Sequence, residues 1–234
     1  MLFVAIVVLL AAFFALALRR TQPTSAAPGE RAGAVGVLAV ALAVSLLIPG
    51  VLAVGGLLDR YAPLPAPALL VVLLVSIGTA WLAFSGVGSR LATGLPLAAL
   101  VGYQTFRVPV EWLLHRLYLE GVIPVEMTYA GRNFDIVTGL TAGALALYLA
   151  SGRSARGLVL VWNCLGLALL ANIVAVAVLA TPVPFRYFVE GPANRLPSTF
   201  PYVWLPTFLV QAALLGHLLV FRALARASSR PSDW

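Results

Sequence analysis

Residues 157–180, GLVLVWNCLGLALLANIVAVAVLA, form a long apolar run without a charged side chain. About 20 apolar residues, at roughly 1.5 Å per residue in a helix, cross the roughly 30 Å hydrocarbon core of a bilayer. A charge-free run of this length is typical of a membrane-spanning helix. It predicts that the chain is an integral membrane protein.

Six other segments have the same apolar character, so we predict an all-α, seven-helix transmembrane bundle forming a single domain, residues 1–234. The predicted spans are approximately 2–18, 34–58, 67–86, 95–117, 134–150, 157–180 and 201–221. The first is the shortest, but the pair Arg19-Arg20 follows its apolar run. A cleaved signal peptide has its positive charge in front. We therefore expect a retained first helix, with cleavage as the alternative.

The composition excludes several classes of protein. Hydrophobic residues make up 62% of the chain and charged residues 10%. Soluble domains average roughly 45–50% apolar and about 25% charged residues. All 15 basic residues are Arg. A Schiff base to retinal or pyridoxal phosphate and a P-loop are therefore excluded, because each needs a Lys. The single Cys164 excludes an intrachain disulfide and a four-Cys iron–sulfur cluster. No cofactor is predicted.

The distribution of Arg predicts the orientation. With the 19–33 loop inside, the inner segments hold nine Arg and the outer segments five, while Arg107 lies within a span. Positive charge is enriched in cytoplasmic loops, so we expect the N-terminus outside and the C-terminus inside a plasma (inner) membrane. The formal net charge of +7 then reflects orientation in the bilayer rather than a nucleic-acid partner.

The fourth predicted span carries most of the polar side chains. Within GYQTFRVPVEWLLHRLYLEG (102–121), five of them recur at intervals of three or four residues: Gln104, Arg107, Glu111, His115 and Tyr118. This spacing places them on one helix face, which must meet protein or water rather than lipid. Pro109 lacks an N–H and should kink the helix by freeing the carbonyl of Thr105.

Other spans provide possible partners for this polar stripe, the five side chains at 104, 107, 111, 115 and 118. Asn133 precedes Asp135 at the start of the fifth span. Asn133 could cap that helix, and Asp135 suits the positive end of the helix dipole. Gln211 in the seventh span is the expected contact of the stripe. Asn163 in the sixth span is expected to make an interhelical hydrogen bond.

Two metal-based interpretations follow from the histidines. Glu111 and His115, at positions i and i+4, could bind zinc or iron with Asp135 as third ligand, although this spacing is weakly specific. A haem between His115 and His217 is excluded if these residues lie near opposite membrane surfaces, about 24 Å apart at roughly 1.5 Å of helical rise per residue. His217 is accordingly expected at the inner interface.

Intramembrane charge favours a functional site, so we expect an outward-facing polar cavity centred on Arg107 that binds or translocates a small, anionic molecule or ion. The candidate ligand-binding residues are Gln104, Arg107, Glu111, His115, Asn133, Asp135 and Gln211. The alternatives are a purely structural network, a membrane-embedded enzyme acting on a lipid or quinone head group, and a subunit of a membrane complex. Besides the lipid bilayer, the expected partners are the ligand and either another membrane protein or a second copy of the chain.

Overall fold

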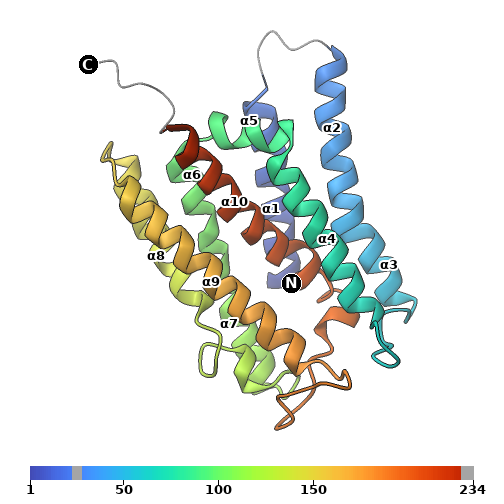
Figure 1. The fold of residues 1–234 in the computed structure, drawn as a ribbon. Coiled ribbons are helices and arrows are strands. Elements are labelled where there is room, and N and C mark those ends of the chain that lie inside the picture. Colours follow the sequence, from blue (N-terminus) through green and yellow to red (C-terminus); the bar gives the residue numbers. More distant parts are fainter. Residues whose placement is uncertain (23–27, 228–234) are drawn as a thin grey trace.

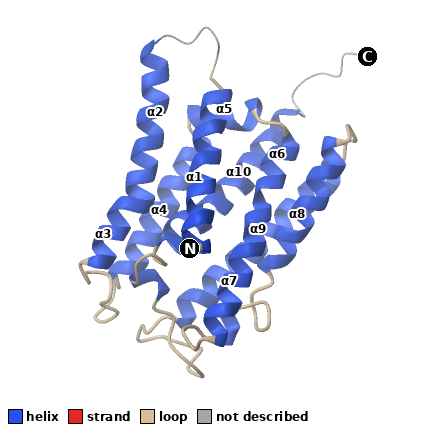
Figure 2. Ribbon diagram, turned by 180° about the vertical axis from the view of Figure 1, so that it is seen from behind, coloured by secondary structure: helices blue, strands red, loops and turns tan. Residues whose placement is uncertain are grey.

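The computed structural model describes residues 1–22 and 28–227, apart from the side chains of 28, 30–32, 34 and 227. Its regular elements are all helices within this described part (Figures 1 and 2). The long helical stretches are α1 (Leu2–Arg20), α2 (Pro28–Leu42) continuing into α3 (Ile48–Val54), α4 (Pro67–Phe84), α6 (Leu97–Gly102) continuing into α7 (Arg107–Leu119), α8 (Asp135–Ala150), α9 (Arg156–Ala180) and α10 (Val210–Ala227). The all-α fold is confirmed.

Five of these stretches are long and apolar enough to cross a membrane: Leu2–Arg20, Val35–Val54, Pro67–Phe84, Arg156–Ala180 and Leu205–Arg226. The two other predicted spans are also helical. One is α8, a shorter apolar helix, and the other is the run from α6 to α7, which is divided by a 3-10 turn. Many large apolar side chains on the outer faces are exposed, such as Leu73 at 55% and Leu165 at 61%. Such exposure is expected for surfaces that face lipid.

The segment between the third and fourth predicted spans is helical rather than a loop, since it forms α5 (Gly86–Gly94). Its start is capped by Ser85, whose Oγ accepts a hydrogen bond from the N–H of Gly88. The short capped helix turns the chain between α4 and α6 at the end of the bundle that also holds the α8–α9 turn (Figure 1).

The last helix is the centre of the bundle. In the segment Leu205–Arg226, 61% of the apolar window is buried, against 17–33% in the four other candidate spans. Helices α4, α5, α6 and α9 all pack against α10. Any polar side chain on α10 is therefore positioned to meet several helices at once.

Proline residues interrupt three of the stretches. Pro109 follows the 3-10 turn η2 (Tyr103–Phe106), as expected where its missing N–H leaves the Thr105 carbonyl free. Pro49 and Pro206 lie at π-helical turns, η1 (Ala43–Leu47) and η5 (Leu205–Leu209). The two π-helical turns pack together, and the Thr207 hydroxyl donates to the Ser45 carbonyl at 2.7 Å. This hydroxyl replaces the N–H that Pro49 lacks.

Candidate functional site

The guanidinium of Arg107 is the centre of a buried polar cluster. The residue is 2% exposed, and each of its three nitrogens makes a hydrogen bond. Nε donates to Gln104 Oε1 at 3.2 Å, Nη1 to Asp135 Oδ1 at 2.5 Å and Nη2 to His217 Nε2 at 3.0 Å. An unpaired charge at this depth would cost several kcal/mol, so the ion pair with Asp135 is what allows Arg107 to be buried.

The hydrogen bonds of His217 determine its tautomer. A guanidinium has only donors, so Nε2 of the imidazole must accept and the ring proton lies on Nδ1. That Nδ1 donates to Asn163 Oδ1 at 2.8 Å, and Asn163 Nδ2 donates to the His217 carbonyl at 3.0 Å. The approach of α9 and α10 requires Gly166, because a Cβ there would lie 2.6 Å from His217 Cε1. The expected interhelical bond of Asn163 is confirmed.

The expectation that His217 lies at the inner interface is wrong. His217 is fully buried and lies near the middle of the helical run Leu205–Ala227. The prediction started this span at residue 201, but residues 199–204 are mostly turns, and the helix continues beyond residue 221. The error in helix limits displaced His217 from the middle of the helical run towards its end.

Two side chains of η2 bind the backbone of α10. The Tyr103 hydroxyl donates to the Ala212 carbonyl at 2.7 Å, and Gln104 Nε2 donates to the Ala213 carbonyl at 3.1 Å. Both side chains cross α10 at Gly216, where any Cβ would collide with the Tyr103 hydroxyl and Gln104 Nε2. The absence of a side chain at Gly216 therefore positions Gln104 to accept from Arg107.

Glu111 and Asp135 are linked through Asn133. Asn133 Nδ2 donates to Glu111 Oε2 at 2.6 Å and to the Met127 carbonyl at 3.1 Å, while Asn133 Oδ1 accepts from the Asp135 N–H at 3.1 Å. The side chain of Asn133 thus binds a free N–H at the start of α8, as the predicted capping role requires. Glu111 pairs with Asn133 and not with Arg107, because Asp135 approaches the guanidinium from the neighbouring helix.

The free hydrogen-bonding capacity of the cluster is limited. The second carboxyl oxygens, Glu111 Oε1 and Asp135 Oδ2, have no hydrogen-bond partner among the described residues. Arg107 retains one N–H on Nη1 and one on Nη2 without an acceptor in the same part of the chain. The cluster can therefore both accept from and donate to a ligand.

His115 does not join the cluster. It is half-buried, stacks on Tyr129 with 4.5 Å between ring centroids, and leaves Nδ1 buried without a hydrogen-bond partner among the residues that the structure describes. Each step of four residues rotates a helix by about 40° beyond a full turn, so His115 lies about 80° from the direction of Arg107. No group of three or more His, Cys, Asp and Glu within the described ranges is arranged to hold a metal ion, so the site of Glu111, His115 and Asp135 is not formed.

Gln211 also lies apart from the stripe. Its Nε2 donates to Ser76 Oγ on α4 at 3.0 Å and to the Pro206 carbonyl at 2.9 Å. The residue is 4% exposed, and its Oε1 is buried without a hydrogen-bond partner in the described part of the chain. The expected contact of Gln211 with the fourth predicted span is therefore replaced by a contact between α10 and α4.

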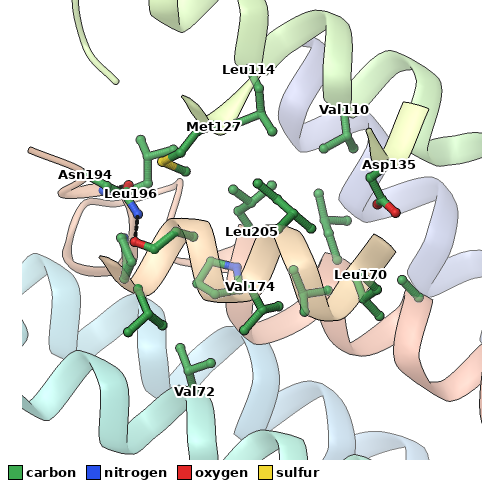
Figure 3. Close-up of a pocket in the computed structure, with 18 of the residues that line it drawn as sticks. Val72, Val110, Leu114, Met127, Asp135, Leu170, Val174, Asn194, Leu196 and Leu205 are labelled. Atoms are coloured by element: carbon green, nitrogen blue, oxygen red, sulfur yellow. Dashed lines mark hydrogen bonds between the residues drawn. The ribbon is translucent and has the colours of Figure 1, made fainter. Parts of the chain in front are cut away.

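A cavity of about 90 Å³ adjoins the cluster (Figure 3). Its lining comes from α4, η2, α7, α8, α9 and the last helical stretch, together with residues 127, 181, 194, 196 and 197, and most of it is apolar. Three ionisable side chains, Arg107, Glu111 and Asp135, line one end of the cavity, and Asn194 lies at the end opposite Asp135 (Figure 3). Asn194 and Thr181 are bonded to backbone carbonyls of α9. The cavity was expected to be polar, but it is an apolar chamber with one charged end.

Sequence reasoning missed two members of the cluster, Tyr103 and His217. Both carry a signal that could have indicated them. His217 is a single imidazole within the apolar run LLGHLL, and it directly follows the Gly216 that permits close approach. Tyr103 precedes Gln104 and, at the 3-10 turn, turns towards the same helix as its neighbour.

Residues 63–225 match the family described as a domain of unknown function (DUF8737). The chain belongs to this family. The matched segment runs from the loop before α4 into α10, so it contains Arg107 and every side chain that binds it. No curated protein and no solved structure matches the chain.

Proposed function

We propose that the protein binds a small amphiphilic molecule within its helical bundle. The polar end of the ligand lies at Arg107, Glu111 and Asp135, and its apolar part lies among α4, α7, α9 and α10. One observation carries the proposal: Arg107, Glu111 and Asp135, each buried, lie together at one end of the cavity, and the remaining walls are mainly apolar. Binding sites for small molecules commonly combine such apolar walls with a few convergent polar groups.

The charge of the cluster favours a hydroxyl over an anion as the polar end of the ligand. Asp135 compensates Arg107 at 2.5 Å, and Glu111 lines the same end of the cavity. An anionic group would meet two carboxyl groups there, whereas a hydroxyl both donates and accepts. The anion predicted from Arg107 alone is thus replaced by an uncharged polar group.

Binding fits the geometry better than passage through an open channel. Beyond Arg107, the bonds of Tyr103 to Ala212 and Gln104 to Ala213 join η2 to α10, and His217 joins α10 to α9. These contacts separate the cavity from the end of the bundle that carries α5. Translocation would require all of them to open.

We also propose that all seven helical stretches cross a plasma membrane, with the N-terminus outside. The α6–α7 run and α8 extend through the bundle alongside the other stretches (Figures 1 and 2). The loops at 55–66, 120–134 and 181–204 share one end, and α5 with the α8–α9 turn lies at the other. Arg90, Arg153 and Arg222 lie at the end with α5, which agrees with a cytoplasmic position.

A membrane-embedded enzyme remains a weaker alternative. Its proposed base or metal ligand, His115, lies outside the Arg107 cluster beside Tyr129. Glu111 and Asp135 would then have to supply the acid–base chemistry without it. Because His115 lies apart from the cluster, the contacts of the described residues favour a binding protein over an enzyme.

The test uses the two methionines of the chain, Met1 and Met127, of which Met127 lines the cavity. Protein labelled with ¹³C at the methionine methyl groups is titrated with 1-octanol in lipid nanodiscs. We expect a saturable shift of the Met127 signal and none of the Met1 signal. Ala177→Phe, which fills the cavity from α9, should abolish the shift, whereas Ala171→Phe on the exposed face of α9 should retain it. A shift that does not saturate, or equal shifts in both variants, would reject the proposal.

A further inference from the structure

The exposure of the lining residues changes along the cavity. The walls around the charged end are buried, including Val110, Leu114 and Leu209. The side chains on one flank are half-buried instead: Leu69 and Val72 of α4, Val174, Ala177 and Val178 of α9, and Leu205, Pro206 and Val210 of the last helical stretch. The cavity therefore has a mouth on this flank.

The mouth lies between two helices that cross the bilayer. Both α4 and α9 pack along α10, but they do not pack closely on each other. Val72 of α4 and Val174 of α9 both line the cavity on this flank (Figure 3). Since α4 and α9 are both candidate membrane spans, an opening between them faces lipid rather than water.

The size of the cavity limits what it can enclose. Its volume is about 90 Å³. An engineered cavity that accommodates benzene is larger, at roughly 150 Å³. A polar group and a few carbons fill the smaller space. A longer molecule must leave through the mouth.

Resting on the proposed function, we infer that the ligand is a single-chain lipid alcohol that enters head-first from the bilayer. Its hydroxyl lies at Arg107, Glu111 and Asp135, and its hydrocarbon chain passes between α4 and α9 into the membrane. The free carboxyl oxygens and guanidinium N–H groups match a hydroxyl, and the half-buried apolar mouth matches a chain. The part of the alcohol's hydrocarbon chain outside the mouth stays among the lipid tails before and after binding. Its length therefore does not change the affinity of the protein for an alcohol that is already dissolved in the bilayer.

Chain length gives the first test. We expect 1-octanol, 1-dodecanol and 1-hexadecanol to shift the Met127 signal with half-saturation at the same mole fraction in the lipid, within about twofold. Val72→Trp should block the mouth and raise half-saturation at least tenfold, while Leu73→Trp, on the exposed side of α4, should leave it unchanged. Saturable binding of octanol combined with no binding of hexadecanol would overturn the inference and leave the proposed function intact. No saturable binding of any alcohol would refute both.

Photocrosslinking gives the second test, because it shows which end of the alcohol lies in the cavity. Two hexadecanol probes carry a diazirine, one beside the hydroxyl and one at the far end of the chain. The first should label peptides containing Val110, Leu114 or Met127, which line the buried part of the cavity, and excess hexadecanol should prevent this labelling. Labelling of these peptides by the far-end probe instead would show tail-first entry and overturn the inference.

Discussion

Arg107 Nη2 lies 3.0 Å from His217 Nε2, and this contact joins α7 to the centre of α10. His217 is in turn hydrogen-bonded to Asn163 of α9, and Asp135 of α8 pairs with the guanidinium of Arg107. Three helices thus meet at the Arg107 side chain, and α9 joins them through His217. The cavity lies beside this junction, so its charged end is held by contacts that also hold the bundle together.

The ion pair between Arg107 and Asp135 should dominate local stability. Asp135→Ala leaves a buried guanidinium without its carboxylate, and we expect a loss of about 3–5 kcal/mol in the free energy of unfolding. Glu120→Ala removes the exposed pair with Arg116 and should cost less than about 1 kcal/mol. Denaturant unfolding of both variants in micelles makes the comparison. Equal losses would contradict the central role of Asp135.

The absence of a side chain at Gly216 should be essential. Gly216→Ala places a methyl group against the Tyr103 hydroxyl and Gln104 Nε2. Overpacking of this kind costs about 1–3 kcal/mol. Gly78→Ala is the matched control on α4, since a Cβ there has no neighbour within 4 Å. Alanine there should favour the helix by up to about 1 kcal/mol. Thermal unfolding should therefore shift in opposite directions. A stabilised Gly216→Ala would show that the η2–α10 contact is loose.

The His217 ring should be neutral with its proton on Nδ1. ¹⁵N NMR of histidine-labelled protein at pH 7 distinguishes this tautomer from the Nε2–H form by the chemical shifts of the two ring nitrogens. Asn163→Leu removes the acceptor of the Nδ1 proton and should change these shifts, whereas Asn172→Leu, whose side chain binds the Arg132 carbonyl, should not. A proton on Nε2 would contradict the bond from Arg107.

Stability should fall at high pH because of Tyr61, in the loop before α4. Its hydroxyl donates to Ser198 Oγ at 2.8 Å, and burial raises the pKa of Tyr61 above its ordinary value of about 10. A pKa that is higher in the folded state means that the stabilisation is complete below the pKa of the unfolded chain and is lost as the pH rises through the folded pKa. Unfolding curves from pH 8 to 11 should therefore decline more steeply for wild type than for Tyr61→Phe. Parallel curves would contradict this role.

Local patterns were sufficient to predict the long helices, but not the short α5, and part of the cluster. Long charge-free runs such as 157–180 identify helices directly, and the three- and four-residue spacing correctly placed Gln104, Arg107 and Glu111 among buried partners. Asn133 before Asp135 was recognisable as a capping sequence. These features depend on neighbours within a few residues along the chain.

The features of the site that the sequence did not predict depend on tertiary contacts. His217 was misplaced because the start of its helix is set by the turns at 199–204 and the π-helical turn with Pro206, which hydropathy does not show. Gln211 faces α4 because of the rotation of α10, and His115 diverges from the stripe by the helical twist. The apolar nature of the cavity follows from which helices enclose it. Hydropathy alone cannot distinguish a cavity wall from a lipid-facing surface.

The most direct test of the central claim compares 1-octanol with octanoate at pH 7 by the shift of the Met127 methyl signal. The two probes share a chain and differ in the charge of the polar end. We predict that octanol binds at least tenfold more tightly, a difference of about 1.4 kcal/mol. The reason is that Asp135 already compensates Arg107 and that Glu111 lines the same end of the cavity. Octanoate binding as tightly as octanol, or more tightly, would contradict the account and identify Arg107 as the centre of an anion site.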